Sequence, residues 1–149
     1  MSAQGGELNR LAASATTHCL TGCALGEVLG MVIATAADFG DATSIVLSVL
    51  LAFLFGYGLT SLPLVRAGLG PRGIVATALA ADTISIAIME AIDNGTVLLV
   101  PGALDAGLGD GLFWAPLLGG FALAWPVTFT ANRALIRRGK GHAVVHEHH

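Results

Sequence analysis

The sequence predicts an all-α polytopic membrane protein, a bundle of four transmembrane helices with both termini in the cytoplasm. Apolar residues make up 54% of the 149 residues and charged residues only 11%, whereas soluble domains carry roughly 25% charged residues. The mean hydropathy is +0.77, and the apolar residues come in long blocks. These blocks match the roughly 20 residues that a helix needs to cross a hydrocarbon core about 30 Å thick.

The same composition excludes several other classes of protein. The high apolar content excludes a disordered chain or a collagen. Only seven Lys and Arg residues are present, so a basic nucleic-acid binder is excluded and no nucleic-acid partner is expected. Two cysteines are too few for a disulfide framework.

Four spans are expected, at about residues 17–37, 43–65, 73–100 and 111–136. The second and the fourth are the clearest, because residues 45–65 and residues 112–132 each run for 21 residues without a charge. The first and the third are also long and apolar but contain ionisable groups. Turn-forming Asp, Gly and Pro residues separate the blocks and support a count of four.

Basic residues near the span ends predict the orientation in the membrane. With four spans, all seven basic residues fall on one side: Arg10, Arg66, Arg72, Arg133, Arg137, Arg138 and Lys140. The chain then divides into a cytoplasmic N-terminal segment (1–16), a transmembrane domain (17–138) and a cytoplasmic His-rich tail (139–149). A cleaved signal peptide is the less favoured alternative for the first span, because its apolar region would contain His18 and Glu27.

Two stripes recur every four residues along the first span. One consists of small residues that allow close helix packing: Gly22, Gly26 and Gly30. The other is a ladder of thiol, thiol, carboxylate and thioether: Cys19, Cys23, Glu27 and Met31. A charged group at mid-span costs about 2.5–3.5 kcal/mol on insertion scales, so Glu27 is expected to face protein or water. The cysteines on its stripe then face inward too, either as ligands or as small packing residues.

The third span carries acids that match Glu27. On a helix, Asp82, Met89 and Asp93 fall within about 40° of one another, and Glu90 either flanks the same groove or faces a neighbouring subunit. Spans one and three run in the same direction, so Glu27 and Asp82 are expected at similar depth, where they could meet. The alternative for Asp93 is a solvated carboxylate near the outer surface.

The C-terminal tail contains four histidines within eight residues: His142, His146, His148 and His149. Neutral imidazole suits copper, nickel and zinc, so the tail is a candidate metal-binding segment. The alternatives are an affinity-tag remnant or a plain flexible tail. The interruption by Ala-Val-Val and Glu147 argues against the tag.

Several motifs together resemble a known family. They are His18-Cys19, Gly22-Cys23 and Gly26-Glu27; Ala81-Asp82-Thr83 with Met89-Glu90; Pro101-Gly102-Ala103; and the ending Arg138-Gly139-Lys140-Gly141-His142. The chain resembles, over nearly its whole length, the bacterial membrane family catalogued as domain of unknown function 4396. The resemblance implies a small helical bundle in a bacterial inner membrane and a tail that belongs to the protein. It implies no reaction.

These residues favour a protein that binds or translocates a transition metal, with copper first and zinc second, because thiolate and thioether select soft ions. The candidate metal ligands are His18, Cys19, Cys23, Glu27, Met31, Asp82, Met89, Glu90, His142, His146, His148 and His149. Four spans are few for a transporter, so a homo-oligomer within the lipid bilayer is expected.

Two alternatives stay open. One is a proton or cation conduit that uses the acids Glu27, Asp82, Glu90 and Asp93. The other is an assembly or structural subunit of a larger membrane complex, in which the glycine stripe binds a partner. Lipid or quinone binding between the helices is a further possibility. An enzyme is not expected, because the sequence contains no phosphate loop, dinucleotide fingerprint or nucleophile–base–acid set.

Overall fold

The computed structural model describes residues 2–139 and consists of four long helices. They are α1 (Ser2–Ala36), α2 (Asp41–Arg66), α3 (Pro71–Leu99) and α4 (Gly111–Arg137). Each is long and apolar enough to cross a membrane, which confirms the predicted all-α fold and indicates an integral membrane protein. The side of the membrane on which the termini lie stays a prediction.

Local chemistry explains where the helices begin and end. Asp38 adopts a left-handed conformation (φ 56°) between α1 and α2, and Gly68 does so (φ 85°) between α2 and α3. Pro71 occupies the first turn of α3, where its missing N–H costs no hydrogen bond. The Asp110 carboxylate caps α4 by accepting a hydrogen bond from the Leu112 N–H at 2.9 Å.

The first helix is longer than the sequence predicts. It begins at Ser2, so residues 2–16 continue the helix of the first span without a break, and their place outside the membrane stays a prediction. The Arg133 side chain of α4 donates a hydrogen bond to Asn9 Oδ1 at 2.7 Å, which fixes this extension against the bundle. The start of the helix is therefore a poor reference for the depth of residues in the membrane.

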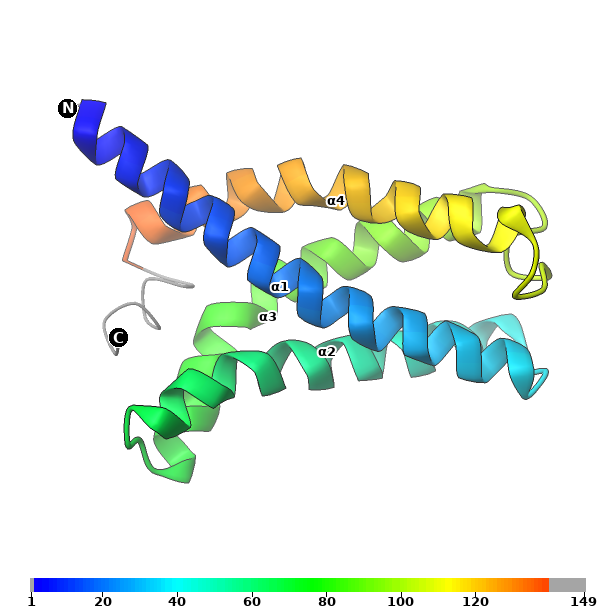
Figure 1. Cartoon of the computed structure of the whole chain (residues 1–149), viewed down its shortest axis with the longest axis horizontal. Helices are drawn as coiled ribbons and strands as arrows, with labels where there is room; N and C mark the ends of the chain where they lie inside the picture. The colour runs from blue at the N-terminus through cyan, green and yellow to red at the C-terminus, as the bar shows by residue number, and fades with distance from the viewer. Residues whose placement is uncertain (1, 140–149) are drawn as a thin grey trace.

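The helices form two hairpins that cross (Figure 1). In that view α1 and α3 run along opposite diagonals, with α2 along the lower side of the bundle and α4 along the upper side. The start of α1, the α2–α3 connection and the end of α4 lie at one end of the bundle, which we call the terminal end. The α1–α2 and α3–α4 connections lie at the other end, which we call the loop end.

The backbone of α1 packs closely against that of α2 in the first hairpin. A Cβ atom added at Gly22 would lie 2.8 Å from the Cα of Gly56, and one added at Gly30 would lie 2.5 Å from the Cα of Ser48. A Cβ at Gly26 would overlap the Leu51 carbonyl. The glycine stripe is thus buried within the chain, against the α2 backbone.

We expect Gly26→Ala to destabilise the bundle, because the added methyl group would meet backbone that cannot give way. Overpacking of this kind typically costs about 1–3 kcal/mol. Gly58→Ala on α2 is the matched control, since nothing lies within 4 Å of a Cβ at that position. Thermal unfolding in detergent should show a lower Tm for Gly26→Ala only; equal Tm values for the two variants would contradict this packing.

The interior changes character along the bundle. Towards the loop end it is an apolar core, which we call the loop-end core: Met31, Val97, Ala103, Ala106, Phe113, Leu117 and Phe121. Nearer the middle lies a second cluster, which we call the sulfur layer: Cys19, Cys23 and Met89, packed with Ala52, Ile86 and Ala124. The candidate site lies between these two clusters.

Candidate metal centre

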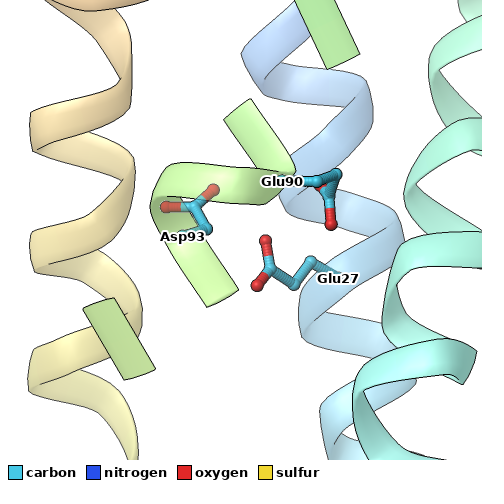
Figure 2. Close-up of side chains that lie close together, drawn as sticks. All are labelled: Glu27, Glu90 and Asp93. Atoms are coloured by element: carbon cyan, nitrogen blue, oxygen red, sulfur yellow. The ribbon is translucent and has the colours of Figure 1, made fainter. Parts of the chain in front are cut away.

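Three acidic side chains meet inside the bundle. Glu27 comes from α1, and Glu90 and Asp93 come from α3. One carboxylate oxygen from each lies within 4.8 Å of those of the other two. Figure 2 shows Glu27 reaching from α1 toward the two acids on α3. We call this group the carboxylate triad.

The two helices bring these residues to the same depth. Glu27 is nine residues before the end of α1, and Glu90 is nine residues before the end of α3, so each lies about 14 Å from its loop end. That is close to half the thickness of a hydrocarbon core of about 30 Å. Glu90 and Asp93 are three residues apart and therefore neighbours on one helix face.

The fourth helix closes the site behind Asp93. A Cβ atom at Gly120 would lie 2.5 Å from Asp93 Oδ1 and 3.0 Å from Asp93 Cα. No side chain can therefore stand between α4 and this carboxylate. Gly119, next along the helix, has open space where its Cβ would be, so the close approach belongs to Gly120 specifically.

The triad is almost completely shielded from solvent. The exposed fraction is 0% for Glu27, 5% for Glu90 and 0% for Asp93. Asn94 Nδ2 donates to Glu90 Oε2 at 3.2 Å and to the Glu90 carbonyl at 3.0 Å. Within residues 2–139, Glu90 Oε1 and both oxygens of Glu27 and Asp93 find no hydrogen-bond donor outside the triad.

The negative charge of three buried carboxylates must be neutralised. No Lys or Arg occurs between residues 11 and 65 or between residues 73 and 132, so the helical stretches around the triad supply no fixed basic charge. An ionised carboxylate without a partner is very costly in a medium of low polarity. The three acids must therefore share protons, bind a cation, or both. A divalent ion with one retained proton would neutralise them.

We expect Asn94→Ala to weaken cation binding at the triad by about 10-fold, the lower end of the effect of losing a group that orients a metal ligand. Its amide holds Glu90 in place through the hydrogen bonds described above. Thr96→Ala is the control, because within residues 2–139 the Thr96 hydroxyl donates to the Ile92 carbonyl of its own helix and to no triad residue. Equilibrium dialysis measures both affinities, and an unchanged affinity in Asn94→Ala would count against Glu90 as a ligand.

The structure distributes the other predicted ligands over separate places. Cys19, Cys23 and Met89 are buried together in the sulfur layer, while Met31 lies in the loop-end core. His18 Nε2 lies 3.2 Å from the Thr60 hydroxyl of α2. The tail histidines His142, His146, His148 and His149 lie outside the described residues.

Asp82 is not the neighbour of Glu27 that the sequence predicts. It is buried, with 1% exposed, but lies eight residues before Glu90 on α3, about 12 Å nearer the terminal end. The expected pairing counted depth from the starts of the two spans, and α1 starts much earlier than expected. Counting from the loop ends pairs Glu27 with Glu90.

Comparison with known proteins supplies a family but no activity. The family model described as "Domain of unknown function (DUF4396)" matches residues 8–141. The chain belongs to this DUF4396 family. No curated protein and no solved structure matches this chain. This DUF4396 member is therefore a four-span membrane protein of unknown function, and its buried triad is the best guide to what it does.

The donors around the triad of this DUF4396 protein fit a metal ion. Three carboxylates offer six oxygens, of which only Glu90 Oε2 accepts a hydrogen bond from a described residue outside the triad. Asn94 Oδ1 is also buried without a hydrogen-bond partner among the described residues, and so adds a neutral oxygen beside Glu90. Oxygen sets of this kind suit zinc, manganese and magnesium.

Sequence reasoning missed the role of Asn94 and of a buried polar network nearer the terminal end. Asn132 Nδ2 donates to the Thr16 hydroxyl at 3.0 Å, and the Ser85 hydroxyl donates to Asn132 Oδ1. Thr16 in turn donates to the Ala12 carbonyl. The four-residue spacing of Glu90 and Asn94 is a signal that could have identified the amide. No sequence signal points to Asn132, because its partners come from two other helices.

Proposed function

We propose that this protein binds a divalent transition-metal ion at the carboxylate triad inside the membrane, as the central site of a metal-translocating bundle. The observation that carries the proposal is the meeting of three buried acids, from two helices, whose oxygens find almost no donor in the rest of the described chain. Groups of this kind within a membrane are costly and mark ion pathways or proton relays.

The donor set favours zinc or manganese over copper(I) at this site. Carboxylate oxygens are harder ligands than thiolate or thioether sulfur, and copper(I) prefers the latter. The order expected from the sequence, copper before zinc, depends on Cys19, Cys23 and Met89, which lie in the neighbouring sulfur layer. Zinc is therefore the first ion to test, because it accepts oxygen and sulfur ligands alike.

The experiment is equilibrium dialysis of the purified protein against Zn²⁺, Mn²⁺, Mg²⁺ and, under reducing conditions, Cu(I). A variant with the four tail histidines replaced by alanine removes any contribution of the tail. We expect one Zn²⁺ per chain in that variant and none when Glu27, Glu90 and Asp93 are replaced by Gln, Gln and Asn. If the variant without the tail histidines binds no Zn²⁺, the proposal is contradicted.

A proton conduit is the second candidate function. The same unpartnered carboxylates favour it, because acids that lack fixed partners can take up and release protons. Proton flux into vesicles that contain the protein separates the two functions. If the protein is a metal-binding protein and not a proton conduit, a pH gradient alone should drive no proton flux that depends on Glu27.

The glycine stripe of α1 is not available for the assembly function. Gly22, Gly26 and Gly30 contact the α2 backbone of their own chain, so a partner helix cannot occupy that stripe. An assembly role would need a different face of the bundle.

A further inference from the structure

The interior on the terminal side of the carboxylate triad differs from the interior on the loop side. Towards the terminal end the buried side chains include many polar groups: Thr16, Thr60, Asp82, Ser85, Thr128 and Asn132. Towards the loop end the loop-end core is apolar. The buried serines on that side are Ser44 and Ser48, whose hydroxyls donate to carbonyls of their own or the adjoining segment.

The loop side is also tightly filled. Its cavity, lined by Met31, Val97, Phe113 and their neighbours, measures about 10 Å³, which is at the lower limit for a single water molecule. An ion travelling to the triad from that side would have to open an apolar core. An ion travelling from the terminal side would meet oxygen donors first.

A buried hydroxyl marks the route on the terminal side. Thr128 of α4 has 0% of its surface exposed, and its Oγ1 has no hydrogen-bond partner in the described part of the chain. It is four residues from Asn132 of the polar network and four residues from Ala124 of the sulfur layer. The Thr128 hydroxyl thus lies one helical turn from the polar network and one helical turn from the sulfur layer. There it can contact water or an ion that passes between the two.

The sulfur layer stands between this polar region and the triad. Cys19 and Cys23 are one turn apart on α1, fully or almost fully buried, and packed in one cluster with Met89 of α3. Cys23 lies one helical turn from Glu27 on α1, and both side chains are buried, so Cys23 adjoins the triad. Met89 immediately precedes Glu90 on α3. An ion from the terminal side therefore reaches the carboxylates past three sulfur atoms.

We propose that metal ions enter the triad from the terminal end, through a passage whose last step is lined by Cys19, Cys23 and Met89, and that this step selects transition-metal ions against Mg²⁺ and Ca²⁺. The inference rests on the proposed metal site and adds its route and its selectivity. Sulfur replaces water readily around zinc and copper. Mg²⁺ gives up its water reluctantly and Ca²⁺ requires oxygen ligands. Sulfur atoms therefore do not make up for the water ligands that either ion would lose in this passage.

The two native cysteines are the reporters for this passage. The full-length protein in sealed vesicles is treated with a charged, membrane-impermeant methanethiosulfonate from one side at a time, in a Cys19→Ala background that leaves Cys23. We expect Cys23 to react from the side of the terminal end only. Zn²⁺ should slow that reaction at least 10-fold, and Mg²⁺ should leave it unchanged. The Cys19→Ala/Cys23→Ala variant is the control for background labelling.

Several outcomes would overturn the passage. They are reaction from the loop side, no reaction from either side, or equal protection by Zn²⁺ and Mg²⁺. In Glu27→Gln, Cys23 should still react from the terminal side but lose its protection by Zn²⁺. If the wild-type protein binds Zn²⁺ at the triad but Cys23 behaves in one of these ways, the route alone fails. If it binds no Zn²⁺ at all, the metal site fails together with the route.

Discussion

Glu27→Gln should weaken Zn²⁺ binding at the triad by at least about 100-fold, since losing a ligand exceeds the 10- to 100-fold effect of losing a supporting group. Glu27 is the only member of the triad on α1, so it is the group through which an ion would join the two hairpins. The glutamine has nearly the same size, and the fold should persist.

The same substitution should change stability in opposite ways with and without metal. In wild-type protein, Zn²⁺ at 100 times its Kd should stabilise the fold by about 2.7 kcal/mol, and at the same Zn²⁺ concentration this gain should fall to about 0.4 kcal/mol or less in Glu27→Gln. Without metal, the variant should be at least as stable as the wild type, because it buries one acid fewer. Differential scanning calorimetry in detergent measures both effects.

Two control substitutions make the result for Glu27 specific. Asp38→Asn changes an exposed acid of the α1–α2 connection and should leave the Zn²⁺ response unchanged, since asparagine tolerates the left-handed backbone there. Asp82→Asn changes a buried acid outside the triad and should preserve one Zn²⁺ per chain. Loss of binding in Asp82→Asn together with normal binding in Glu27→Gln would refute the assignment of the site.

Gly120→Ala should lower stability and weaken Zn²⁺ binding together. The new methyl group would meet the Asp93 side chain and Cα at 2.5–3.0 Å, which would displace the carboxylate from the triad. We expect a loss of about 1–3 kcal/mol in unfolding free energy and, because a ligand moves, at least about a 10-fold loss of affinity.

The neighbouring glycine is a matched control for this substitution. Gly119→Ala places a methyl group in open space and should raise helix stability by up to about 1 kcal/mol without changing Zn²⁺ affinity. Chemical unfolding and equilibrium dialysis of the two variants give the comparison. If Gly120→Ala binds Zn²⁺ as the wild type does, the triad is not the site that holds the ion.

The sequence predicts the fold well because a membrane span leaves a strong signal. The long uncharged blocks at residues 45–65 and 112–132 became the centres of α2 and α4. The start of α1 could not be predicted in the same way, because residues 2–16 are too polar for a span. They are helical through good helix formers and contacts such as that of Asn9 with Arg133.

The candidate site was predicted in part. Glu27, Glu90 and Asp93 each stand out in the sequence as a costly group in an apolar block. Their meeting could not be predicted, because it depends on how far each helix extends and on where α1 crosses α3. Residue counts from the predicted starts of the first and third spans paired Glu27 with Asp82. Residue counts from the loop ends of α1 and α3 pair Glu27 with Glu90.

The most direct test of the account is X-ray absorption at the zinc edge on the full-length protein with its four tail histidines replaced by alanine, loaded with one Zn²⁺ per chain. The triad predicts a first shell of oxygen at roughly 2.0–2.2 Å and no sulfur. A sulfur shell at about 2.3 Å would place the ion at Cys19 and Cys23 instead. Such a spectrum, or a protein that cannot be loaded at all, would contradict the carboxylate triad as the metal centre.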